Sequence, residues 1–254
     1  MNNMKEKRKV AVVSGGIGGV GRAVCTQLAQ DGFDVVALYL RTSQEEAENF
    51  MKTLASGNHR AIQCDIREPD SVERVFAEIL QAHGEIYACV HAAVDPILRK
   101  DLLLIDNIEL KNELETAFIG GFNIFKCAVP SMKRLGEGRI IGILSRYIFT
   151  NTAHKKMGGY LLAKHALRGL LRELYLELVA TKIMVTAIAP EFLDTKLSAD
   201  LPEEVREFIK TRGVYGSMRN PKDVAGAVSF LCSKKGSGMN GKIFSPEESD
   251  IVSL

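Results

Sequence analysis

The feature that most constrains how this chain folds is an alternation of short apolar runs, rich in β-branched residues, with longer amphipathic segments. Segments with helical spacing include Val20–Gln30, Glu45–Ala55, Ser71–Ala82 and Ala163–Val179. Strands that alternate with long helices form right-handed βαβ units around a parallel sheet. The pattern therefore predicts an α/β fold with helices flanking a mostly parallel, seven-stranded sheet. The expected strands are Val10–Ser14, Asp34–Leu40, His59–Gln63, Ile86–His91, Arg139–Ser145, Ile183–Ala189 and Lys242–Phe244.

Composition limits the number of domains, the partners and the compartment. No Pro/Gly/Ser-rich linker divides the 254 residues, so we expect a single domain over residues 1–254. A net charge of +2 predicts neither a nucleic-acid partner nor a membrane partner. The five cysteines are scattered and form no CxxC or Cys/His cluster, so we expect no disulfide framework and no metal site. The N-terminus lacks a signal-peptide core and no apolar run is long enough to span a bilayer, so we expect a cytoplasmic protein.

A glycine-rich turn follows the first predicted strand. Residues 14–21 read Ser-Gly-Gly-Ile-Gly-Gly-Val-Gly and lead into a predicted helix. Glycines permit a tight turn and a close backbone approach to a pyrophosphate, and the start of the helix offers free N–H groups. At the first strand-to-helix junction, this turn predicts a Rossmann-type, doubly wound domain that binds a dinucleotide; a structural turn without a ligand is the alternative. The residues expected to contact the dinucleotide are Gly15, Ile17, Gly19, Val20 and Gly21.

Three further residues predict an acid–base site. Tyr160 and Lys164 are four residues apart in a predicted helix, so their side chains share one helix face. A nearby ammonium ion stabilises a phenolate and lowers the pKa of a tyrosine from its usual value of about 10. Ser145 ends a predicted strand at the carboxyl edge of the sheet, where its hydroxyl can hydrogen-bond a substrate carbonyl. We therefore expect Ser145 to position an oxygen, Tyr160 to transfer a proton and Lys164 to tune Tyr160.

With its Gly15-x3-Gly19-x-Gly21 turn, its serine and its YxxxK motif, the chain from Lys9 to Ile243 resembles the short-chain dehydrogenase/reductase family. Within that family it is most similar to the 3-oxoacyl-thioester (acyl-carrier-protein) reductases. The resemblance implies that Ser145, Tyr160 and Lys164 are catalytic, and that Tyr160 and Lys164 also contact the cofactor. It implies further cofactor contacts at Asp65 and Ile66 after the third strand, Ala92 and Ala93 after the fourth, and Pro190 and Thr195 after the sixth. A turn cap is the alternative role of Asp65.

The end of the second predicted strand bears on which nicotinamide cofactor binds. An acidic residue there would accept hydrogen bonds from the ribose 2′-hydroxyl of NAD. The chain instead has Tyr39, Leu40 and Arg41, followed by two hydroxyl residues. This segment favours NADP(H) over NAD(H), because Arg41 suits a 2′-phosphate. The alternative is that Arg41 is a solvated charge beside Glu45 and Glu46.

Several positions differ from the usual family residues at the rim of the expected site. Val94 stands where relatives have a glycine after the fourth strand, and Glu191 replaces the glycine after Pro190. Ala117 stands at the position of a helix asparagine that supports a proton-relaying water chain in the family. His91, which ends the fourth strand, is expected to be a packed, hydrogen-bonded residue rather than a catalytic base.

These features leave two functional hypotheses. The first is an NADPH-dependent oxidoreductase that reduces a carbonyl, with a small molecule or an acyl thioester such as a 3-oxoacyl thioester as substrate. Lys155, Lys156 and Arg212 would then meet an acyl-carrier phosphate, unless they are solvated loop charges. The second is a catalytically weak or inactive relative that acts as a dinucleotide sensor or partner subunit, which Val94, Ala117 and Glu191 favour.

Two irregular stretches and two helices complete the predictions. Thr150–Gly159 and Asp194–Gly216 follow strands and are candidate substrate walls or lids. The second stretch has a short helical pattern near Pro202–Arg212. The predicted helices Glu113–Arg134 and Gly159–Val179 have apolar residues on more than one face, so we expect a homodimer or homotetramer.

Overall fold

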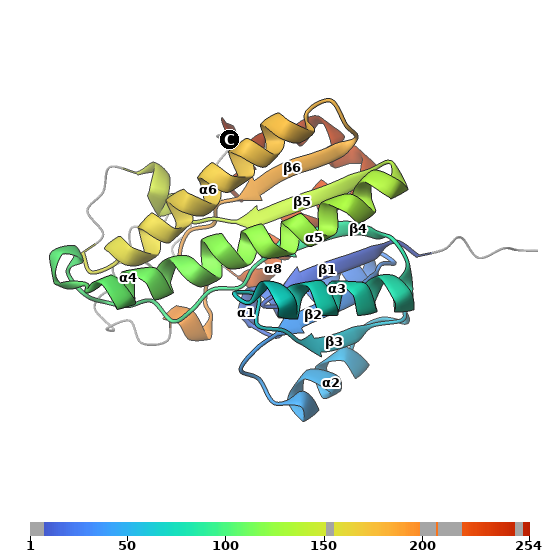
Figure 1. The fold of residues 1–254 in the computed structure, drawn as a ribbon, viewed down its shortest axis with the longest axis horizontal. Helices are drawn as coiled ribbons and strands as arrows, with labels where there is room; N and C mark the ends of the chain where they lie inside the picture. Colours follow the sequence, from blue (N-terminus) through green and yellow to red (C-terminus); the bar gives the residue numbers. More distant parts are fainter. Residues whose placement is uncertain (1–7, 151–154, 199–206, 208–219, 247–250) are drawn as a thin grey trace, which may run out of the picture.

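The fold is built on one sheet with helices on both faces (Figure 1). The computed structural model describes residues 8–150, 155–198, 207, 220–246 and 251–254. Within these residues, the strands follow the order β3-β2-β1-β4-β5-β6-β7-β8. The first seven strands are parallel, and β8 pairs antiparallel with β7. The strands are β1 (Val10–Ser14), β2 (Asp34–Tyr39), β3 (Arg60–Gln63), β4 (Ile86–His91), β5 (Gly138–Ile143), β6 (Ile183–Ile188), β7 (Lys242–Phe244) and β8 (Ile251–Ser253).

Alternate residues of the central strands pack into two separate hydrophobic cores, one on each face of the sheet. In β1, Val10 and Val12 pack with the layer of α3, α5 and α6, whereas Ala11 and Val13 pack with α1 and α8. Because both faces of the central strands are covered, these strands are buried along their length and mostly apolar. The main helices are α1 (Gly19–Gln30), α2 (Gln44–Lys52), α3 (Pro69–His83), α4 (Asn107–Leu114), α5 (Gly120–Leu135), α6 (Gly158–Leu178) and α8 (Pro221–Cys232).

The α/β prediction is confirmed, with the seven expected strands in parallel order. The sequence pattern did not reveal β8, a three-residue strand at the edge of the sheet that pairs antiparallel with β7 and so lies outside the alternation of parallel strands and helices. The helical segment predicted from Glu113 starts earlier, at Asn107. Asp106 caps α4, and the Glu109 side chain reciprocates by accepting from the Asp106 N–H.

One turn between α4 and α5 is wider than an α-helical turn. Residues Glu115–Ile119 form a π-helix, and Ala117 lies at its centre. Single π turns inside α-helices occur frequently at functional sites. Here the π turn joins α4 to α5 near the carboxyl ends of the strands (Figure 1).

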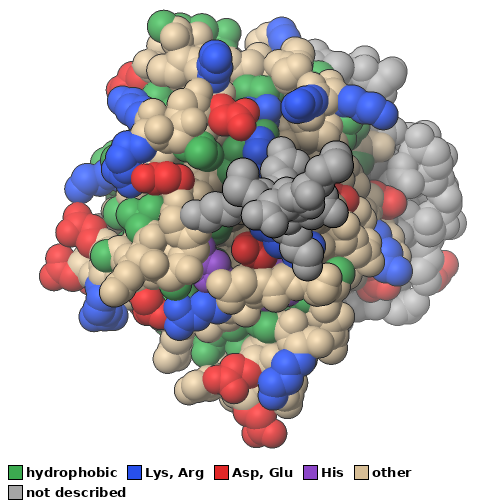
Figure 2. All heavy atoms as spheres, turned by 90° about the vertical axis from the view of Figure 1, so that its right-hand side faces the viewer, with side chains coloured by type: hydrophobic (Ala, Val, Ile, Leu, Met, Phe, Trp, Pro, Cys, Tyr) green, Lys and Arg blue, Asp and Glu red, His purple; other side chains and the backbone are tan. Residues whose placement is uncertain are grey.

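The strand order places the expected ligand site. The order reverses between β1 and β4, and ligands of doubly wound sheets bind at such a point, beyond the carboxyl ends of the strands. Figure 2 shows the opposite edge, where the strands begin. Basic and acidic side chains are interspersed over its described surface, without a continuous patch of one sign.

Candidate active site

The glycine turn is packed against the end of β4. Gly15 has a φ of +66°, a conformation that favours glycine, and a Cβ there would lie 2.8 Å from the Ala93 Cα. The Gly16 N–H donates to the Leu38 carbonyl, and the Gly18 N–H to that of Gly15. The backbone of the turn is therefore held against both neighbouring strands.

The start of α1 forms an open cradle. Gly18 occupies the N-cap position of α1, where a side chain would normally accept from the first free N–H groups, and it provides no such cap. Thr195 borders the cradle next to Gly19. A Cβ on Gly19 would lie 2.9 Å from the Thr195 Cγ2, so a side chain there would crowd Thr195. Free N–H groups, a positive helix end and glycine walls fit the pyrophosphate of a dinucleotide. Of the residues predicted to contact it, Gly15, Ile17, Gly19, Val20 and Gly21 all belong to this turn and first helical turn.

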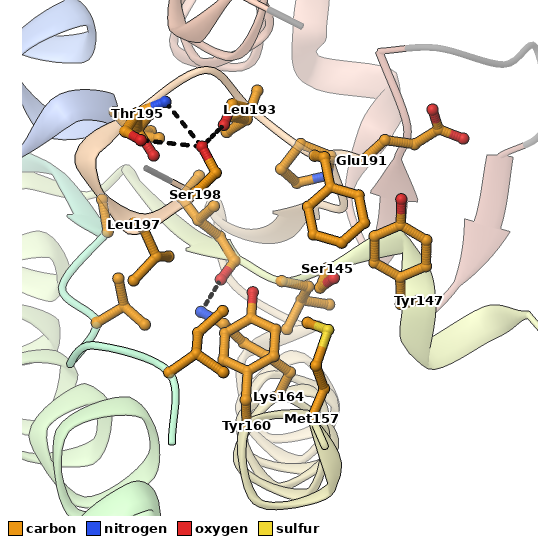
Figure 3. A pocket seen from close by; sticks show the side chains of 18 of the residues that line it. Ser145, Tyr147, Met157, Tyr160, Lys164, Glu191, Leu193, Thr195, Leu197 and Ser198 are labelled. Atoms are coloured by element: carbon orange, nitrogen blue, oxygen red, sulfur yellow. Dashed lines mark hydrogen bonds between the residues drawn. The ribbon is translucent and has the colours of Figure 1, made fainter. Parts of the chain in front are cut away.

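Ser145, Tyr160 and Lys164 line the same pocket, as predicted from their order on a strand end and a helix (Figure 3). Lys164 is 4% exposed, and its Nζ donates to the Ile143 carbonyl at 2.8 Å. This bond fixes the ammonium beneath Tyr160, with its Nζ 5.6 Å from the centre of the phenol ring. The phenol oxygen of Tyr160 points into the pocket.

Burial shifts the proton affinities of this pair in opposite directions. Desolvation lowers the pKa of Lys164 to about 8, because the pocket disfavours its charged form. Desolvation also raises the pKa of Tyr160 to about 12, and the Ser145 side chain opposes that shift. In this state Tyr160 is therefore protonated at neutral pH, which is the form that a general acid requires.

His91 links the end of β1 to the π turn through two hydrogen bonds. Its Nδ1 lies 2.7 Å from the Ser14 Oγ, and its Nε2 lies 3.0 Å from the Ala117 carbonyl oxygen. Desolvation lowers the pKa of His91 to about 3, so it is neutral near pH 7. His91 is thus the packed, hydrogen-bonded residue that was expected. Ala117 lacks an asparagine side chain, but its backbone carbonyl lies in the π turn beside the site.

The far wall of the pocket contains an ion pair and an aromatic pair. Glu191 bonds the Arg146 guanidinium at 3.3 Å, so the charge that replaces the family's glycine is compensated. Tyr147 and Phe192 pack with their ring centres 4.8 Å apart. Val94 also lines the pocket, as expected from its position after β4. The sequence analysis did not single out Arg146 as a site residue. Its position directly after Ser145 is the one sequence signal that could have indicated this role.

The other end of the expected cofactor groove has two Arg–Asp pairs. The Arg41 Nη2 lies 2.6 Å from the Asp95 Oδ1, so Arg41 does not pair with Glu45 or Glu46. Arg67 binds Asp65 through both its Nε and Nη2, at 2.8 and 2.6 Å, and these bonds lower the pKa of the Asp65 carboxyl. Asp65 is therefore already engaged as a turn-forming acceptor, which was the alternative to a purely adenine-binding role.

Four of the remaining predicted residues make hydrogen bonds through their backbones. Ile66 is buried beneath Gly120, and its carbonyl accepts from Asn123, which therefore holds the turn after β3. The Ala92 N–H donates to the Ser14 carbonyl, and the Pro190 carbonyl accepts from the Arg146 N–H. Thr195 is held by Ser198, whose Oγ accepts from its N–H.

Some predictions fall elsewhere. Arg212 and most of the segment Pro202–Arg212 lie outside the described residues. Lys155 and Lys156 are described and exposed. Within the described part of the chain, no helix is long and apolar enough to cross a membrane, and no His/Cys/Asp/Glu cluster forms a metal site.

Comparison with known proteins identifies the family. A family model described as enoyl-(acyl carrier protein) reductase matches residues 15–246. Since this match spans most of the chain, the protein belongs to that family of short-chain dehydrogenases/reductases. It is therefore an oxidoreductase that uses a nicotinamide dinucleotide.

Individual relatives agree with this assignment. The 3-oxoacyl-(acyl-carrier-protein) reductase FabG of Staphylococcus aureus is 29% identical, over 92% of this chain and 94% of the relative. Dehydrogenase/reductase SDR family member 4 of Mus musculus is 30% identical, over 92% of this chain and 84% of the relative. A solved structure of actinorhodin polyketide ketoreductase with NADPH superimposes with a TM-score of 0.85 at 23% identity, covering 94% of this chain and 95% of the other, and supports the fold.

The buried state of Lys164 predicts a pH-dependent stability. Its pKa rises from about 8 when folded to the ordinary 10.5 when unfolded, so the unfolded chain binds more protons between these values. The cost of burying the ammonium is thus present below pH 8 and disappears as the pH rises to 10.5. We expect the wild type to gain about 1–3 kcal/mol relative to Lys164→Met across this window.

The measurement is urea unfolding of the two proteins without cofactor at several pH values. Lys126→Met, which removes an exposed lysine of α5, serves as the matched control and should show no such gain. A difference between wild type and Lys164→Met that is independent of pH would contradict the assigned burial of the charge.

Proposed function

We propose that the protein is an NADP(H)-dependent carbonyl reductase in which Ser145, Tyr160 and Lys164 are the catalytic residues. The observation that carries this proposal is their convergence in one pocket beside the glycine cradle, with Lys164 anchored on the Ile143 carbonyl. When bound, a nicotinamide dinucleotide supplies the hydride. The cradle at the start of α1 would hold its pyrophosphate, and Pro190 and Thr195 would flank its nicotinamide end.

The chain's own groups then handle the oxygen and the proton. Ser145 donates a hydrogen bond that places the substrate carbonyl, and Tyr160 gives its proton to the developing alkoxide. Lys164 lowers the cost of the resulting phenolate, because its ammonium lies below the ring. The Ala117 carbonyl and neutral His91 maintain the π turn beside this group.

The substrate that we favour is a 3-oxoacyl thioester. The FabG relatives act on 3-oxoacyl-acyl-carrier protein by their names, and the pocket has an apolar wall suited to an acyl chain, formed by Met157, Phe192, Leu193 and Leu197. The alternative function, a dinucleotide sensor or partner subunit, is favoured by Val94, Ala117 and Glu191, which depart from the usual family residues; Val94 and Glu191 line the pocket. Tight cofactor binding without reduction of any carbonyl would support that alternative.

Replacing Tyr160 tests the reductase directly. We expect Tyr160→Phe to lower the turnover of acetoacetyl-CoA, a 3-oxoacyl thioester, by about 10²–10⁴-fold, because the proton donor is lost. NADPH binding, followed by nicotinamide fluorescence, should remain. Tyr147→Phe is the matched control, since it removes a hydroxyl from the same pocket and leaves the ring packed against Phe192. Full activity of Tyr160→Phe would refute the proposed acid.

Replacing Arg41 tests the cofactor preference. We expect wild type to bind NADPH more tightly than NADH, and Arg41→Ala to weaken NADPH binding about tenfold, because a charge-assisted bond to the 2′-phosphate is lost. NADH binding should change little. Arg60→Ala, which breaks an exposed ion pair with Glu78 at the sheet edge, is the control. Tighter binding of NADH by the wild type would overturn the preference.

We propose that the chain forms a homodimer or homotetramer through α5 and α6. Ile119, at the end of the π turn, is 37% exposed, and Phe122 on α5 is 46% exposed on the same helical segment. We expect Phe122→Glu to give a lower mass in light scattering, because a buried carboxylate would cost several kcal/mol at the interface. Phe230→Glu changes an equally exposed ring on α8, across the sheet, and should keep the assembly. A monomeric wild type would contradict this proposal.

A further inference from the structure

A charged residue outside the predicted site, Asp95, lies opposite Arg41. Arg41 follows β2 and Asp95 follows β4, and β1 lies between these two strands in the sheet. The ion pair of 2.6 Å between them therefore passes over the carboxyl end of β1, where the glycine turn begins. This is the place where the adenosine of the proposed cofactor would lie.

The two partners of this ion pair are held very differently. The Asp95 Oδ2 accepts a hydrogen bond from the Thr116 hydroxyl, and Thr116 belongs to the π turn. The π turn is itself anchored by buried His91, whose Nε2 is hydrogen-bonded to the Ala117 carbonyl oxygen. The Asp95 side chain is 25% exposed, whereas that of Arg41 is 61% exposed. Within the described residues Arg41 makes no second hydrogen bond or ion pair, and its remaining interaction is a longer-range attraction that lowers the pKa of Asp65. Arg41 can therefore move away while Asp95 stays in place.

We propose that Asp95 competes with the cofactor's 2′-phosphate for Arg41 and thereby sets the affinity for NADP(H). When the 2′-phosphate binds, it replaces the Asp95 carboxylate as the partner of the Arg41 guanidinium. Asp95 then remains in place as a nearby negative charge that repels the phosphate. Asp95 thus keeps the phosphorylated cofactor exchangeable. This inference rests on the proposed NADP(H) preference, and the following experiment separates the two.

The test uses the adenosine half of each cofactor, so the nicotinamide pocket does not influence the result. Calorimetry would measure binding of 2′,5′-ADP and 5′-AMP to wild type, Asp95→Asn, Arg41→Ala and the double variant. Asparagine keeps an oxygen that can accept from Thr116, so the variant removes the charge and retains the anchor. Glu78→Gln, which neutralises the carboxylate of the exposed pair with Arg60 at 2.6 Å, is the matched control.

We expect Asp95→Asn to bind 2′,5′-ADP about threefold to fivefold more tightly than wild type, the size typical of a partly exposed ion pair. Binding of 5′-AMP should stay unchanged, and the gain should vanish in the Arg41→Ala background. Unchanged or weaker 2′,5′-ADP binding by Asp95→Asn, in a wild type that prefers 2′,5′-ADP, would overturn this inference alone. Equal binding of the two probes by both wild type and Asp95→Asn, or binding of neither probe, would overturn the phosphate role of Arg41 as well.

Discussion

The close contact between the glycine turn and the end of β4 is the constraint on which the site depends. Gly15 lies against the backbone of Ala93, so the loops after β1 and β4 share one surface. His91, at the end of β4, then links Ser14 to the Ala117 carbonyl of the π turn. The elements β5 and α6 bring Ser145, Tyr160 and Lys164 to the same edge. A side chain at Gly15 would separate these loops, because its Cβ would overlap the Ala93 backbone.

Burial is the second determinant of the site. Lys164 and His91 are both enclosed, and enclosure lowers the pKa of each. Their charges nevertheless differ near neutral pH. His91 loses its proton because its shifted pKa lies far below 7, whereas Lys164, with a pKa of about 8, still carries its own. Of these two residues, only Lys164 therefore contributes a positive charge, and that charge lies directly below the tyrosine ring.

The features that the sequence predicts well are those set by local chemistry. Strand and helix alternation, the glycine turn and the Ser145–Tyr160–Lys164 order depend on spacing along the chain, and the structure brings these residues to one edge of the sheet. The partners of Arg41 and Glu191 were not predictable, because Asp95 and Arg146 reach them across neighbouring loops. The start of α4 was misplaced, since its capping box precedes a segment with weak apolar periodicity.

The π turn at Glu115–Ile119 has a consequence for how this segment can change. The Ala117 contact with His91 uses a backbone carbonyl, so this hydrogen bond does not depend on the side chain at position 117. A deletion of one residue is a different matter. It would close the widened turn into an ordinary α-helical turn and so remove the backbone arrangement that presents the Ala117 carbonyl to His91. The segment is thus constrained in length independently of its side chains, and insertions or deletions should be rarer there than substitutions.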